Sequence, residues 1–225
     1  MLKKRKAKKV KKIIRYLKLL FIPVSVLFLA TVYTGAYFSS SISSSGNGFS
    51  AGMWSPGKAT ITEVFYDAVG TDTGLEWIEI ENTGGYALDM TGYVLHFDGT
   101  GTHDFIFPTF SLVSGAKVLV HVRAIGTNTP AELFWSDTNG KNMGDSYGSV
   151  VLFNALPKDE TTIVDFVQYG AIDQDGEPKA VTAGIWTDNT FVPLVSAPGI
   201  SMELISSDNN LVADWQEQII PNPGS

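Results

Sequence analysis

The chain contains no cysteine among its 225 residues, which excludes disulfides and thiol catalysis. It is also poor in positive charge over most of its length. Ten of its sixteen Lys and Arg residues lie in the first eighteen positions, and the other six follow residue 56. Acidic residues begin only at Glu63. Residues 57–225 therefore hold six basic and 23 acidic side chains, a formal charge of −17, which disfavours nucleic acid and anionic lipid as partners of this part.

The basic head, residues 1–18, runs directly into an uncharged apolar segment, residues 19–38. About 20 apolar residues are enough to cross a bilayer as a helix, and positive charge beside such a segment stays on the cytoplasmic side. We therefore expect one transmembrane or signal helix at 19–38, membrane contact through this helix, and export of the rest. Small residues at Thr34-Gly35-Ala36 suit a signal peptidase. A retained anchor and secretion after cleavage near Ala36 both fit.

Residues 39–56 form a Ser- and Gly-rich linker, a composition typical of flexible tethers. The sequence contains Ala36-Tyr37-Phe38, then Gly46-Asn47, then Phe49-Ser50-Ala51-Gly52. Together these stretches resemble the export signals of the camelysin and biofilm-matrix fibre family, which have an aromatic pair at the cleavage point. The resemblance implies export and processing of the chain, and it does not imply the fibre fold.

Residues 57–225 are long enough for one hydrophobic core, and their pattern is that of an all-β domain. Short runs rich in Val, Ile, Thr and aromatic residues alternate with clusters of Gly, Asp, Asn and Pro. Eight such runs predict a β-sandwich with two long loops, Ala124–Tyr147 and Ala171–Gly199, and no sustained helical period. Since side chains alternate along a strand, Ile78 and Ile80 should point into the core. The expected strands are Ala59–Tyr66, Leu75–Glu81, Gly92–Phe97, His103–Phe107, Lys117–Arg123, Ser149–Asn154, Thr161–Tyr169 and Ile200–Leu204.

Several motifs follow one another through this part of the chain. They are Ile61-Thr62-Glu63-Val64-Phe65-Tyr66, Glu76-Trp77-Ile78-Glu79-Ile80-Glu81-Asn82, Leu88-Asp89-Met90-Thr91-Gly92-Tyr93, Gly144-Asp145 before Val150-Val151-Leu152, and Ile163-Val164-Asp165. Their order and character are similar to the lamin tail domain (LTD), in the form found in bacterial surface proteins. The resemblance implies an immunoglobulin-like β-sandwich. It also implies a noncatalytic role, because such domains are mostly companions of other modules.

Oxygen ligands gather between the first two expected strands, where Asp67, Asp72 and Glu76 alternate with the bends at Gly70 and Gly74. Ca²⁺ takes six to eight oxygens from carboxylates and carbonyls, and a divalent cation would relieve self-repulsion in so acidic a domain. We predict these three residues as ligands of calcium, the candidate cofactor. The loop Asp173-Gln174-Asp175-Gly176-Glu177 is a second candidate. The alternative for both is a solvated acidic turn.

An aromatic pair on a long loop suggests a binding surface. Phe134 and Trp135 lie in the expected loop Ala124–Tyr147, and we predict that they contact a cell-surface protein or glycan. Packing in the core is the alternative for these two rings.

The stretch Gly144-Asp145-Ser146-Tyr147-Gly148 has the spacing of a nucleophile elbow, but that motif needs a helix after it, and here a strand is expected. The sequence therefore predicts a noncatalytic extracytoplasmic binding or structural module at the cell surface. One alternative is a self-assembling extracellular matrix subunit. Another is a calcium- or metal-dependent hydrolase, which would need acids that converge in a pocket.

Overall fold

The computed structural model describes residues 57–98, 103–136, 142–205 and 210–224. The fold below is that of the unit that spans residues 52–225. The predicted basic head, the helix at 19–38 and the linker at 39–56 lie outside the described ranges. Within these ranges, no helix has the length and apolar character that a membrane crossing requires.

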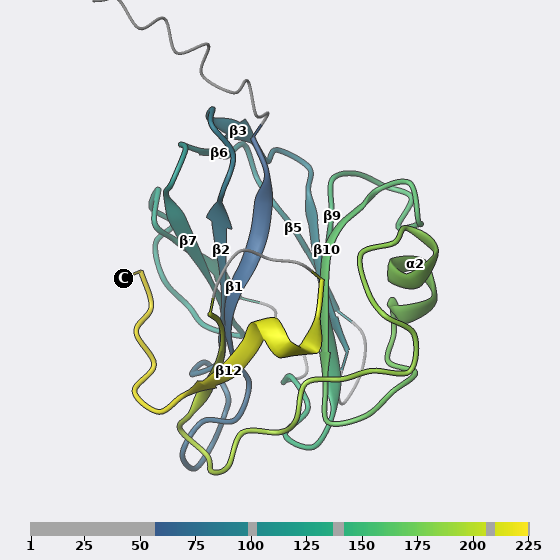
Figure 1. Ribbon diagram of the computed structural model, residues 1–225. Helices are drawn as coiled ribbons and strands as arrows, with labels where there is room; N and C mark the ends of the chain where they lie inside the picture. Colours follow the sequence, from purple (N-terminus) through teal and green to yellow (C-terminus); the bar gives the residue numbers. More distant parts are fainter. Residues whose placement is uncertain (1–56, 99–102, 137–141, 206–209, 225) are drawn as a thin grey trace, which may run out of the picture. The chain divides into compact units, whose positions relative to one another are not determined.

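Two main sheets and one small sheet make up the domain, as predicted for an all-β chain (Figure 1). The six-stranded sheet has the order β12-β11-β1-β2-β7-β8, and the four-stranded sheet has the order β10-β9-β4-β5. The first contains β1 (Ala59–Phe65), β2 (Trp77–Asn82), β7 (Lys117–Val122), β8 (Glu132–Trp135), β11 (Ser201–Leu204) and β12 (Trp215–Gln218). The second contains β4 (Val94–Asp98), β5 (His103–Ile106), β9 (Gly148–Phe153) and β10 (Ile163–Tyr169). The short strands β3 (Leu88–Asp89) and β6 (Ser111–Leu112) pair with each other.

One hydrophobic core joins the two main sheets. Ile78 and Ile80 of β2 are fully buried in it, which confirms the predicted alternation. They pair across the ladder with Val64 and Ile61 of β1, since a bulge between Ile61 and Glu63 shifts the register by one residue. Burial of branched side chains on neighbouring strands is the main source of stability in such a layer.

Asp165 of β10 ties the two sheets together through hydrogen bonds. Its Oδ2 accepts the backbone N–H of Ile61 in β1 at 2.6 Å, and its Oδ1 accepts the N–H of Phe166 at 2.8 Å. β11 pairs with β1 at Glu63 and Val64. Ile61 lies just before the residues that pair with β11, and its N–H is accepted by the carboxylate of Asp165.

The outer face of β2 is also covered, although its residues are polar. Glu79 is buried there, and Nζ of the half-buried Lys117 lies 2.9 Å from its Oε1. The Thr62 hydroxyl donates to the same oxygen at 2.6 Å, and the N–H of Gly224 donates to Oε2 at 2.6 Å. The end of the chain thus folds back over the six-stranded sheet.

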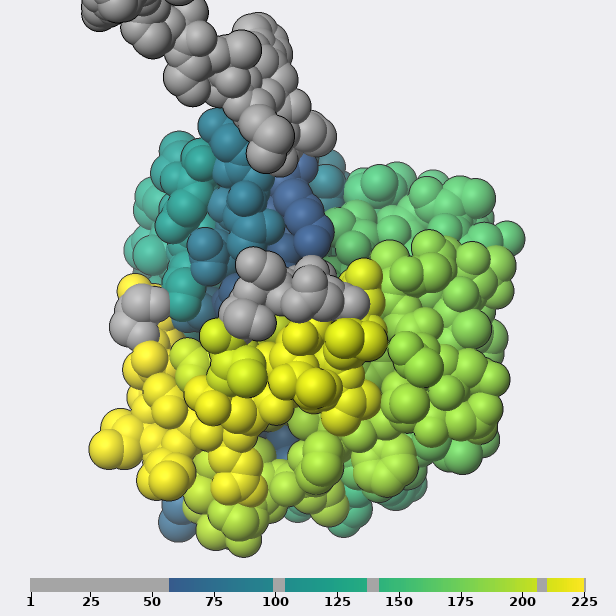
Figure 2. Space-filling model, in the orientation of Figure 1, coloured from purple at the N-terminus to yellow at the C-terminus, as the bar shows by residue number. Residues whose placement is uncertain are grey.

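Both predicted long loops contain regular structure. The first includes β8, which pairs in parallel with β7. The second includes α2 (Glu177–Thr182), and a one-turn 3-10 helix η1 (Val212–Asp214) precedes β12. α2 lies against β10 (Figure 1). A Cβ at Gly176 would meet Val151 Cγ2 at 2.7 Å, so this glycine allows the close approach to the sheet. Residues after 171, light green to yellow, form much of the surface in Figure 2.

Candidate metal centre

The turn between β1 and β2 places two carboxylates at one end of the sandwich. The N–H of Leu75 donates to the carbonyl of Asp72 at 2.8 Å and closes a tight turn. Gly74 has a φ of 78° within this turn, a conformation that glycine adopts without steric cost. The bend brings Glu76 to the position directly before β2, near the side chain of Asp72.

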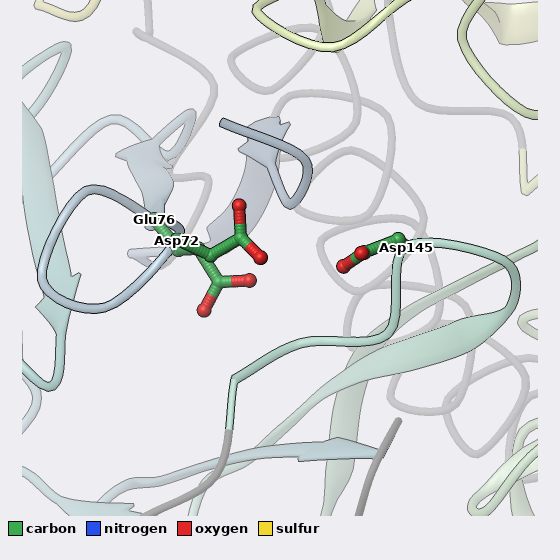
Figure 3. A group of neighbouring side chains, drawn as sticks. All are labelled: Asp72, Glu76 and Asp145. Carbon is green, nitrogen blue, oxygen red and sulfur yellow. The ribbon is translucent and has the colours of Figure 1, made fainter. Parts of the chain in front are cut away.

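A third carboxylate approaches these two from the other sheet. Asp145 lies in the segment that leads into β9, and its oxygen lies within 4.8 Å of oxygens of Asp72 and Glu76, which are equally close to each other. Figure 3 shows the three carboxylates, with Asp145 on the side opposite Asp72 and Glu76. Glu76 is buried, Asp72 is half-buried and Asp145 is exposed. Three oxygens at this spacing could hold one divalent cation.

Glu76 has the most strongly perturbed carboxylate of the group. Burial, together with the charges of Asp72 and Asp145, raises its pKa to about 9, although a hydrogen bond from Met143 and the charge of Arg123 act to lower it. The Met143 N–H donates to Oε2 at 3.0 Å. Oε1 is buried and has no hydrogen-bond partner among the residues that the structure describes.

The predicted ligand Asp67 lies near the group but outside it. Partial burial raises the pKa of Asp67, and the charges of Asp145 and Asp72 add to this effect. Partial burial and the charge of Asp72 also raise the pKa of Asp145. The structure therefore brings together two of the three predicted residues, Asp72 and Glu76, and adds Asp145, which sequence reasoning missed as a candidate ligand. The Gly144-Asp145 motif was the available signal for it.

The second predicted calcium loop, residues 173–177, uses its acids within the fold. Oε2 of Glu177 accepts the N–H of Asp173 at 2.5 Å, and Oε1 accepts the N–H of Asn189 at 3.1 Å. Oδ2 of Asp175 lies 2.9 Å from Nε2 of His96. The Asp175 contact ties the start of α2 to β4 of the four-stranded sheet, and the two Glu177 bonds hold the segments on either side of α2 together.

Two aspartates on the outer face of the four-stranded sheet lead to a prediction about acid stability. Buried His96 lies between Asp104, 2.6 Å from its Nδ1, and Asp175. Partial burial acts to raise the pKa of Asp104, but hydrogen bonds from Lys158 and His96 outweigh it and lower the pKa. For Asp175, partial burial is outweighed in the same direction by His96 and by the charges of Lys179 and Lys158.

A carboxyl whose pKa is lowered by folding stabilises the fold above its unfolded pKa of about 3.9 and loses this contribution as the pH falls through its folded pKa. Asp104→Asn should therefore lose less stability than the unchanged chain between about pH 5 and pH 2. Urea unfolding at several pH values measures this difference. Because Asp104 is 40% exposed, we expect an effect of about 1 kcal/mol or less. Equal acid sensitivity of the two chains would contradict the prediction.

The predicted aromatic pair lies on strand β8 rather than on an irregular loop. Phe134 stacks on His121 with ring centroids 4.6 Å apart, and Trp135 and Phe97 form a T-shaped pair with centroids 5.2 Å apart. Both side chains are half-buried. Packing against these neighbours accounts for much of the placement of the two rings. The predicted contact with a protein or glycan stays a prediction.

The nucleophile-elbow spacing at 144–148 falls at the entry to a strand. Ser146 is exposed, and β9 begins at Gly148 in place of the helix that the motif requires. The strand that follows was expected from the sequence.

A comparison with family models agrees with the order of motifs. Residues 54–171 match the model described as Lamin Tail Domain. No curated protein matches the chain. The match extends from just before β1 to just after β10, over slightly more than half of the 225 residues. The chain therefore belongs to the lamin tail domain family, a group of immunoglobulin-like, noncatalytic modules.

Proposed function

We propose that residues 57–225 are a noncatalytic binding or structural module that is displayed on the outside of the cell. The observation that carries this proposal is the distribution of charge. Ten basic residues precede the apolar segment 19–38, and a part with a formal charge of −17 follows it. Positive charge resists translocation, so the head stays in the cytoplasm while the acidic part crosses. Membership of a noncatalytic family supports a role in binding or structure.

The partner that we propose is a protein or glycan of the cell surface. Phe134 supports this choice, because β8 is the last strand of the six-stranded sheet and the Phe134 ring is only half-buried beside His121. An aromatic ring at a sheet edge offers a flat apolar surface to a sugar or to another aromatic side chain. The negative charge of the domain favours a partner with basic groups.

Treatment of intact cells with a protease tests the location. In cells that express the chain with a tag at its C-terminus, an added protease should remove the tagged domain while a cytoplasmic marker protein stays intact. The same treatment of lysed cells should degrade both. Survival of the tagged domain in intact cells would contradict the proposal. The mass of the mature chain then separates a retained anchor from cleavage near Ala36.

A further inference from the structure

We propose that Asp72, Glu76 and Asp145 bind one calcium ion, and that this ion joins the two main sheets near the C-terminal end of β1. Asp72 and Glu76 belong to the turn that enters β2 of the six-stranded sheet. Asp145 belongs to the segment that enters β9 of the four-stranded sheet. The proposal stands on the geometry of these side chains and does not depend on where in the cell the domain lies.

The buried carboxylate of Glu76 is the observation that points to a ligand. Its side chain is 0% exposed, and Oε1 lacks a hydrogen-bond partner within the described part of the chain. A buried ionised carboxylate is costly unless its oxygens are paired. Here two further carboxylates face it and add repulsion. A cation where the three meet would pair with Oε1 and reverse the sign of the local field.

Arg123 is close but does not supply that pairing. Its Nη1 donates to Oδ1 of Asn142 at 2.7 Å and to the hydroxyl of Thr73 at 3.4 Å. Its charge acts on Glu76 from a distance. With all three acids ionised, three carboxylates and one guanidinium leave a formal charge of −2. A divalent cation neutralises this charge in full.

The donor set selects calcium among the common divalent ions. All three ligands are carboxylates, whereas zinc and copper favour imidazole and thiolate, and the chain has no cysteine. Ca²⁺–oxygen bonds of about 2.3–2.6 Å place ligands on opposite sides of the ion about 4.6–5.2 Å apart. Oxygens that lie within 4.8 Å of one another are close enough to share one such ion. Mg²⁺ demands shorter bonds and a stricter octahedron. Water would complete the six to eight ligands of calcium.

Thermal unfolding of the full-length chain tests the proposal. The chain is purified in a mild detergent, treated with a chelator, and heated in sodium chloride or in calcium chloride of equal ionic strength. The sodium chloride sample measures how much charge screening alone changes the unfolding midpoint. Calcium at about 1 mM, the range typical of extracellular modules, should raise the unfolding midpoint by several degrees more than sodium does. A calorimetric titration with calcium chloride should give about one ion per chain.

Four variants locate the response. Glu76→Gln and Asp145→Asn keep the size of each side chain and should abolish the calcium-specific rise. Asp188→Asn removes one charge from an exposed aspartate outside the group and should keep the full rise. Asp67→Asn should keep most of it, since Asp67 lies outside the group.

Each contrary result overturns the proposal. Calcium and sodium that act alike would mean that only screening occurs. A full response in Glu76→Gln and Asp145→Asn would place the ion elsewhere, and an equal response to magnesium would overturn the choice of calcium. None of these results bears on the protease experiment, so the proposed calcium site and the proposed location of the domain are tested independently.

Discussion

Ile80→Ala is expected to lower the free energy of unfolding of the full-length chain by about 2–5 kcal/mol. Ile80 is fully buried on β2, and β1 and β7 flank it on both sides through Ile61 and Val118. The substitution removes apolar surface from the core and leaves a cavity that a strand between two neighbours cannot close by moving. Urea unfolding, followed by tryptophan fluorescence, measures the loss.

Ile106→Ala provides the matched control. Ile106 also lies on a strand, β5, but its side chain is 57% exposed, so the same substitution should cost less than about 1 kcal/mol. Similar losses for the two variants would show that the assigned face of β2 is wrong.

Asp165→Ala is expected to cost about 3 kcal/mol, the second large effect. The carboxylate accepts the N–H groups of Ile61 and Phe166, at 2.6 Å and 2.8 Å, in a buried position. Alanine would leave both donors without this acceptor, and a buried unpaired donor pays its full cost of desolvation. Denaturant unfolding gives the loss directly.

Two further aspartate substitutions sharpen this test. Asp165→Asn keeps one acceptor oxygen and should fall between the unchanged chain and Asp165→Ala. Asp188→Ala removes an exposed aspartate and should stay within about 0.5 kcal/mol of the unchanged chain. A loss below about 1 kcal/mol for Asp165→Ala would mean that the bond between the sheets contributes little.

The eight strands expected from the sequence all occur. They could be predicted because the pattern of apolar and β-branched residues within each segment is itself typical of a buried strand. Ile78 and Ile80 are the clearest case, since alternation alone assigned their face. The ends of the strands differ by one or two residues. Tyr66, for example, follows β1 rather than ending it.

β8 and α2 were missed for physical reasons. β8 has four residues and pairs in parallel with β7, so no short hairpin turn announces it. α2 has six residues, too few to show a helical period, and it forms because Ala180 and Glu177 are buried against the sheet. In both cases tertiary contacts decide the structure, and local propensity carries little information.

The sequence predicted only part of the candidate site. Asp72 and Glu76 lie four positions apart, and the glycines around them announced a turn. Asp145 follows 69 positions after Glu76 in the sequence and belongs to the other sheet, so only the packing of the two sheets brings it into the group. The burial of Glu76 was equally hidden, since a glutamate at the start of a strand is exposed in most proteins.

The order of strands in the large sheet has a consequence for where this domain ends. The family match stops at residue 171, but β11 (Ser201–Leu204) pairs with β1 in that sheet, and β12 (Trp215–Gln218) pairs with β11. A fragment that ended at 171 would turn β1 into an edge strand with free N–H and carbonyl groups above an apolar core. Such an edge recruits strands from other molecules and leads to aggregation. The residues after the family match therefore cover the edge that β1 would otherwise expose.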